Sequence, residues 1–199
     1  KGCHVVASFG NISASGGVYV GVAADKIVSN PGTITGSIGV ILRGNNLSKL
    51  LDRVGVKFET VKSGAFKDIL SPDRALGVEE RELLQALIDS SYEQFVAAVA
   101  EGRKLGPSRV REFADGRVFS GAQAKDLGLV DELGDEERAR VLAAQLADLD
   151  EDRCRVVTLG KPRKPLLQGL SGSNLLVRLQ EFITVEMELS GQPLWLFRP

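Results

Sequence analysis

The sequence places a serine where a strand is expected to turn into a helix, an arrangement that suits nucleophilic catalysis. Apolar residues 5–9 predict the strand, and the apolar stretch over residues 16–24 predicts a buried helix. Ser15 lies at the corner and is followed by Gly16 and Gly17. Its hydroxyl would then lie at a helix N-terminus, where unpaired backbone N–H groups favour an anion. The two glycines would let a substrate backbone approach closely.

A serine nucleophile needs a base within hydrogen-bond reach. The one histidine, His4, precedes Ser15 by eleven residues, and no obvious aspartate orients it, so we expect it to be structural. A Ser-His-Asp triad would need a histidine from a preceding part of the protein. The Gly-x-Ser-x-Gly elbow pattern is half met, because Ser13 stands in place of the first glycine. Lysine is the remaining base, and it acts only when its amine is neutral.

Lys67 is the best candidate among the lysines. It follows the small and apolar residues 63–66, which could bring its stem inward. Lys62 continues the polar face of an alternating segment, and Lys26 adjoins Asp25, which would hold it charged. Most lysines in proteins are simply solvated, so this argument from local sequence leaves the solvated alternative open.

The elements that must position these residues alternate between strands and helices, which predicts an α/β fold. Strands are predicted over residues 4–9, 26–28, 33–42, 56–61, 129–130, 156–159 and 193–197. Helices are predicted over residues 16–24, 48–54, 78–101, 121–127, 136–149 and 171–189, with a short one beginning at Ser108. Gly55, Gly102 and Gly128 are expected to end helices, and Ser120 to cap one.

Composition excludes several classes of protein. The 199 residues suit one domain with an extension, and the formal net charge of −1 without a basic patch argues against a nucleic-acid partner. Cys3 and Cys154 lie too far apart for a zinc motif, so we expect no metal and no cofactor; the sequence leaves open whether they pair. The chain contains no apolar stretch of about 20 residues. Because it begins at Lys1 within an expected strand, we expect it to be the C-terminal part of a longer protein.

Five short motifs occur together over residues 4–135. They are Ser-Ala-Ser-Gly-Gly, Ala-Asp-Lys-Ile-Val, Thr-Gly-Ser-Ile-Gly-Val, Lys-Ser-Gly-Ala-Phe-Lys-Asp and Asp-Gly-Arg-Val-Phe-Ser-Gly, at residues 13–17, 24–28, 35–40, 62–68 and 115–121. In their order and spacing they resemble the signal peptide peptidase A family, the protease IV or S49 serine peptidases. Each motif alone is unspecific, and the resemblance depends on all five in order.

The resemblance implies a crotonase-like, ClpP-like α/β fold with a Ser-Lys dyad. Ser15 matches the nucleophile of the family and Lys67 the general base of its single-domain members. Ser37 matches a serine that helps to hold the lysine, and the N–H of Gly16 matches an oxyanion donor. The family's other oxyanion donors come from a preceding βαβ unit that this chain lacks. Residues 1–150 would be the truncated catalytic core, and residues 151–199 a C-terminal extension.

The resemblance also implies partners and a location. The substrates would be hydrophobic, unfolded peptides such as cleaved signal peptides, and the protein would be a homo-oligomer. Membrane association would come through the missing N-terminal part, at a bacterial cell membrane or a thylakoid membrane. Two alternatives remain open at this point. One is a crotonase-like acyl-CoA enzyme, which stabilises an enolate with two backbone N–H groups, and the other is a non-catalytic peptide-binding scaffold of the same fold.

Overall fold

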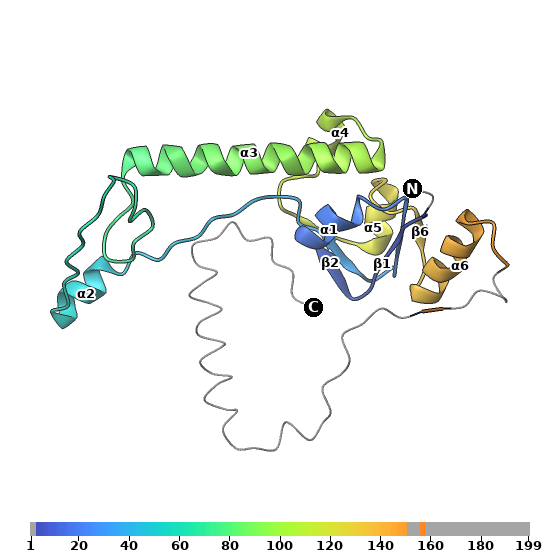
Figure 1. The fold of residues 1–199 in the computed structure, drawn as a ribbon, viewed down its shortest axis with the longest axis horizontal. Helices are drawn as coiled ribbons and strands as arrows, with labels where there is room; N and C mark the ends of the chain where they lie inside the picture. The colour runs from blue at the N-terminus through green and yellow to red at the C-terminus, as the bar shows by residue number, and fades with distance from the viewer. Residues whose placement is uncertain (1–2, 151–155, 158–199) are drawn as a thin grey trace, which may run out of the picture. The chain divides into compact units, whose positions relative to one another are not determined.

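A computed structural model describes residues 3–150 and 156–157 of the chain (Figure 1). These residues fall into two compact units. The first unit contains residues 3–40, 89–150 and 156–157, and the second contains residues 41–88.

Two small sheets form the centre of the first unit. One sheet is parallel and contains, in spatial order, β1 (Val6–Phe9), β3 (Lys26–Ser29) and β6 (Glu132–Leu133). The other contains β2 (Ile12–Ala14), β4 (Ile34–Gly36) and β5 (Val118–Ser120), with β4 parallel to β2 and antiparallel to β5. Consecutive strands β1 and β2 therefore lie in different sheets, and β3 and β4 repeat this arrangement after one helix. The predicted α/β class is confirmed.

The helices largely follow the sequence prediction. They are α1 (Gly16–Gly21), α2 (Ser48–Val54), α3 (Val78–Arg103), α4 (Pro107–Arg111), α5 (Gly121–Asp126) and α6 (Glu136–Leu146). Gly55 ends α2 in the left-handed conformation, with φ 72°. Ser120 caps α5 through a complete capping box with Gln123. Both caps agree with the sequence prediction.

The C-terminal half of α3 supplies the core of the first unit. Phe95, Val96 and Val99 are fully buried, and the ring of Phe95 contacts that of Tyr19 on α1 edge to face, with centroids 5.4 Å apart. The prediction that Gly102 ends this helix is wrong, because α3 continues to Arg103. A Cβ at Gly102 would lie 2.0 Å from the carbonyl oxygen of Val22, so the glycine permits close packing rather than a helix end.

The strand predicted over residues 56–61 is wrong. The alternating pattern is there, but the structure describes no strand in the second unit with which this segment could pair. A strand needs a partner for its backbone groups, and here Phe58 and Val61 are exposed instead. The predicted strand over residues 33–42 stops at Gly36, because Gly36 and Ser37 both have positive φ.

Other differences concern boundaries. Strands β2 and β5 were not predicted, since each is three residues long, and the strand predicted at residues 129–130 lies at Glu132–Leu133. Helix α1 ends at Gly21 and α6 at Leu146, and α4 begins at Pro107, not after a Ser108 cap. The elements predicted over 171–189 and 193–197, and most of that over 156–159, lie outside the described residues.

Candidate active site

Ser15 occupies a strained corner between β2 and α1. Its backbone angles are φ 51° and ψ −113°, a region that residues with a side chain rarely adopt. Two hydrogen bonds hold it there. The Ser15 N–H donates to the Gly36 carbonyl at 2.8 Å, and the Ser15 carbonyl accepts from the Tyr19 N–H at 3.0 Å. Strain that surrounding contacts maintain at one residue is a recurrent feature of catalytic positions.

The hydroxyl of Ser15 does not cap the helix that follows it. Ser15 stands at the N-cap position of α1, yet its side chain accepts no hydrogen bond from that helix. Ser120 shows the ordinary case in the same chain. It has extended backbone angles at the N-cap of α5, and its side-chain oxygen accepts from the Gln123 N–H at 3.2 Å. The Ser15 hydroxyl is therefore not used to satisfy the helix end.

Backbone donors lie next to Ser15. Gly16, Gly17 and Val18 form the first turn of α1, where N–H groups have no acceptor within the helix. Gly16 is buried and directly follows the serine. Such N–H groups stabilise negative charge on an adjacent oxygen, as an acyl-transfer reaction requires.

Ser37 lies at the same sheet edge as Ser15. Strands β2 and β4 are parallel, and Ala14 is opposite Gly36, so the two serines are the residues that follow each strand. Ser37 has the same φ as Ser15, 51°, and its N–H donates to the Arg117 carbonyl at 2.7 Å. The structure thus brings together three of the four residues that the sequence predicts for the site, Ser15, Gly16 and Ser37.

Lys67, the fourth residue, lies in a loop of the second unit. Its N–H donates to the Gly64 carbonyl at 3.2 Å, and the Ile69 N–H donates to the Phe66 carbonyl at 3.2 Å, so the chain forms successive turns there. The sequence suggested that small neighbours bring the lysine stem inward. In the second unit the side chain of Lys67 is exposed.

The other basic groups have partners that the sequence did not predict. Lys26 pairs with Asp131 at 3.2 Å and not with its neighbour Asp25. An oxygen of Asp25 instead lies 3.9 Å from the Nδ1 of His4, which is longer than a hydrogen bond. Both side chains of that pair are about half exposed, at 47% and 54%.

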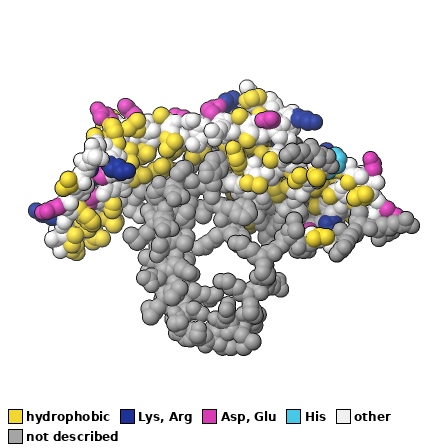
Figure 2. All heavy atoms as spheres, in the orientation of Figure 1, with side chains coloured by type: hydrophobic (Ala, Val, Ile, Leu, Met, Phe, Trp, Pro, Cys, Tyr) yellow, Lys and Arg dark blue, Asp and Glu magenta, His cyan; other side chains and the backbone are white. Residues whose placement is uncertain are grey.

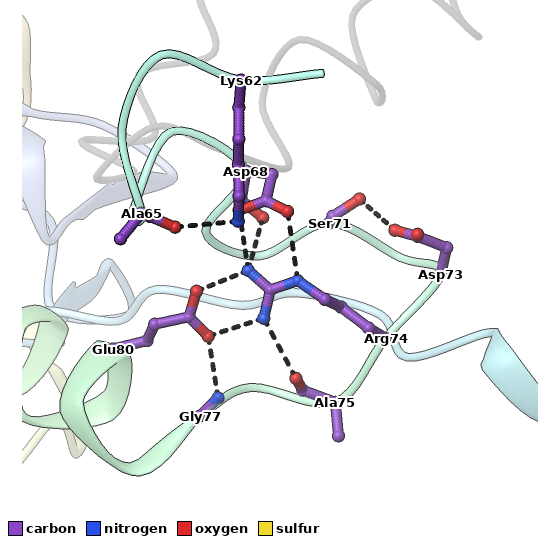
Figure 3. Close-up of polar contacts among 9 residues, drawn as sticks. All are labelled: Lys62, Ala65, Asp68, Ser71, Asp73, Arg74, Ala75, Gly77 and Glu80. Carbon is purple, nitrogen blue, oxygen red and sulfur yellow. Dashed lines mark hydrogen bonds and ion pairs between the residues drawn. The ribbon is translucent and has the colours of Figure 1, made fainter. Parts of the chain in front are cut away.

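Sequence reasoning missed a chain of charges around the Lys67 loop, shown in Figure 3. Lys62 contacts Asp68 at 2.6 Å, Asp68 contacts Arg74 at 2.9 Å, and Arg74 contacts Glu80 at 2.5 Å. We call these four residues the charge chain. They alternate in sign at intervals of six residues. Six is neither a helix nor a strand period, so periodicity analysis does not detect it.

The charge chain keeps both of its carboxylates ionised. Hydrogen bonds from Arg74 and then Lys62 hold the pKa of Asp68 well below its usual range. Hydrogen bonds from Arg74 and from the Gly77 N–H lower the pKa of Glu80 to about 2. Gly77 is the residue before α3, and its N–H donates to Glu80 Oε2 at 2.8 Å, so this carboxylate also closes the N-terminus of the helix.

Within the described residues, no group of three or more His, Cys, Asp and Glu side chains is arranged to hold a metal ion. Nor does any helix in the described part of the chain have the length and apolar character needed to cross a bilayer.

Comparisons with known proteins show the family of this chain. The model of peptidase family S49 matches residues 1–150. A Synechocystis protein named "Putative protease slr0021" is 57% identical over 204 aligned residues, which cover 98% of this chain and 73% of the relative. "Putative signal peptide peptidase SppA" of Enterococcus faecium is 45% identical over 68% of this chain and 39% of its own length. "Serine protease SPPA, chloroplastic" of Arabidopsis thaliana is 35% identical over 84% of this chain and 25% of its own length.

Proposed function

Because this chain belongs to peptidase family S49, we propose that it is a serine endopeptidase in which Ser15 is the nucleophile and Lys67 the general base. The observation that carries the proposal is the conformation of Ser15, a strained N-cap residue whose hydroxyl does not cap. A hydroxyl held in this way at a helix N-terminus suits attack on a carbonyl group. The relative from Arabidopsis is itself named a serine protease.

The reaction is acyl transfer to the serine and then to water. Neutral Lys67 takes the proton of the Ser15 hydroxyl while the oxygen attacks a peptide carbonyl. The Gly16 N–H stabilises the resulting oxyanion. Protonated Lys67 then gives its proton to the leaving amine, and the peptide C–N bond breaks. Water, deprotonated by Lys67, attacks the acyl-enzyme, and the proton returns from Lys67 to Ser15 as the ester breaks.

The proposed fold is the crotonase-like, ClpP-like one, with residues 1–150 as its truncated core. The strand pairing supports this proposal, since β3 is parallel to β1 in one sheet and β4 is parallel to β2 in the other. Ser37 is proposed to help to hold the amine of Lys67, as the family resemblance implies. Its place beside Ser15 at the end of β4 suits this role, because the carboxyl ends of parallel strands gather functional groups.

The proposed substrates are hydrophobic, unfolded peptides, including cleaved signal peptides, and the proposed setting is a bacterial cell membrane or a thylakoid membrane. The names of two relatives support parts of this proposal, since one is "Putative signal peptide peptidase SppA" and the other is "Serine protease SPPA, chloroplastic". Membrane attachment would come from a part of the protein that precedes this chain.

The protein is also proposed to be a homo-oligomer. Helix α2 has no buried residue; Leu50 and Val54 on it are 56% and 62% exposed, and Leu47 at its N-cap is 42% exposed. Figure 2 shows hydrophobic side chains gathered over this helix. Exposed apolar groups at helical spacing mark a surface that a protein partner covers, and a second copy is the partner proposed here.

Hydrolysis of a fluorogenic hydrophobic peptide by the full-length protein tests the dyad. We expect Ser15→Ala and Lys67→Ala each to lower kcat/KM by at least about 1000-fold. If Lys67→Ala keeps near-normal activity while Ser15→Ala is inactive, another group is the base. If neither change matters, Ser15 is not the nucleophile, and turnover of an acyl-CoA thioester would then indicate the crotonase-like alternative.

A further inference from the structure

No side chain of residues 62–77, here called the Lys67 loop, is fully buried, although Ile69, Leu70 and Leu76 are half-buried. Ala65, Phe66 and Lys67 are all exposed, and residues 62–77 form turns without helix or strand. Segments with few buried contacts open readily unless polar bonds hold them. A general base must nevertheless be held to within about 0.5 Å of its working geometry. Polar contacts are therefore expected to restrain this loop together with its half-buried apolar residues.

Arg74 makes the contacts that supply this restraint. Toward the loop, its Nη2 donates to Asp68 Oδ1 at 2.9 Å and to the Asp68 carbonyl at 3.2 Å, and its Nε donates to Asp68 Oδ2 at 3.3 Å. Asp68 is the residue directly after Lys67. The guanidinium thus holds both the side chain and the backbone of the neighbour of the proposed base.

The other side of Arg74 is fixed to a helix end. Its Nη1 and Nη2 donate to the two oxygens of Glu80 at 2.8 and 2.5 Å. The Glu80 residue is only 6% exposed, and the side chain also accepts from the Gly77 N–H (Figure 3). Glu80 is therefore a rigid point in the first turn of α3. A planar guanidinium can bind two carboxylates at once in this way, whereas an ammonium group cannot reproduce the paired geometry.

From these contacts we propose that Arg74 is a positioning residue, which fixes the Lys67 loop to the first turn of α3 through Asp68 and Glu80. The inference rests on the proposed role of Lys67 as the base. Arg74 itself does not touch the substrate or transfer a proton. Without Arg74, the Lys67 amine would still be present, but the loop that carries it would move. A displacement of about 1 Å at a reacting group costs roughly 100-fold in rate.

The test uses the full-length protein and two readouts, peptide hydrolysis and amide hydrogen exchange of residues 62–71. For Arg74→Met we expect kcat to fall about 10- to 100-fold with KM changed less than about threefold. Exchange of residues 62–71 should become faster. Arg74→Lys should recover part of kcat, and Glu80→Gln should act in the same direction as Arg74→Met but less strongly. In a Lys67→Ala background, Arg74→Met should cost nothing further, because the base it positions is gone.

Arg109→Met is the matched control. Arg109 pairs with Glu112 on an exposed surface of the first unit, so this change removes an ion pair without touching the loop. It should leave both readouts unchanged. If Arg74→Met leaves exchange and kcat as in the wild type, Arg74 is not a positioning residue. Faster exchange with unchanged kcat would also overturn the inference, because the position of the loop would then not matter to the reaction.

Failure of the proposed function gives a different result. If Lys67→Ala stays active, Lys67 is not the base, and the dyad fails whatever Arg74 does. The exchange readout does not depend on activity, so it still reports whether Arg74 holds the loop. The two failures are therefore distinguishable.

Discussion

Ser15 and Ser120 both stand at helix N-termini, but they differ in backbone conformation and in hydrogen bonding. Ser120 gains a hydrogen bond for its helix, whereas Ser15 has a positive φ and makes no cap bond. A residue in such a conformation costs about 1–3 kcal/mol relative to an unstrained one. The strained conformation of Ser15 therefore lowers the free energy of unfolding of the protein.

This cost predicts the effect of glycine at position 15. Ser15→Gly should be more stable than Ser15→Ala by roughly 1 kcal/mol, because relief of strain exceeds the about 0.5–1 kcal/mol that the freedom of glycine costs. Urea unfolding of the two variants measures the difference. At Ser8, an exposed residue of β1 with ordinary strand geometry, the order should reverse, with glycine less stable than alanine. Equal stabilities at position 15 would mean that the corner is not strained.

At the scale of elements, the first turn of α3 combines helix capping with a carboxylate of low pKa. Gly77 is a weak N-cap because it has no side chain, and Glu80 compensates by accepting the Gly77 N–H. The same carboxylate binds Arg74. The helix end and the Lys67 loop therefore depend on one ionised group.

The pKa of Glu80 predicts how this element responds to acid. The pKa is lowered from about 4.5 to about 2, first by Arg74 and then by the Gly77 N–H. A group whose folded pKa is depressed stabilises the fold above its unfolded pKa, and that stabilisation is lost as the pH falls. The stability advantage of wild type over Glu80→Gln, measured by urea unfolding, should be complete at pH 6 and shrink between about pH 4.5 and pH 2. Parallel pH curves for the two proteins would contradict this.

The elements that sequence predicted well are those whose signals are local. Helix α2 ends at a glycine and α5 begins at a serine with a glutamine three residues later, and both signals act within one turn. The predicted strand at 56–61 failed because a strand also depends on a partner distant in sequence. The corner at Ser15 was predictable from its two following glycines. The role of Arg74 was not, because its partners lie six residues away on either side in a segment without periodic structure.

At the scale of the whole molecule, the exposed apolar side chains of α2 carry the proposal of self-association. Leu50 is 56% exposed on a helix that buries none of its residues. Leu50→Arg should therefore shift the sedimentation coefficient of the full-length protein toward that of a smaller species, because a charge desolvated at an interface is costly. Lys49→Gln on the same helix is the control and should sediment as the wild type does. A wild-type protein that sediments as a monomer would rule out this surface as a contact between copies.

The two sheets of the first unit are interleaved along the chain, which has a consequence for synthesis on the ribosome. The first pair of strands in each sheet is synthesised early, because β3 and β4 are complete by residue 36. The third strand of each sheet is synthesised only from residue 118 onward. The second unit, residues 41–88, is made in between. At about 5–20 residues per second, the open edge of β4 waits roughly 4–16 s for β5, and that of β3 roughly 5–21 s for β6. For that interval these edges of β3 and β4 stay unpaired, and each is open to any other extended segment nearby.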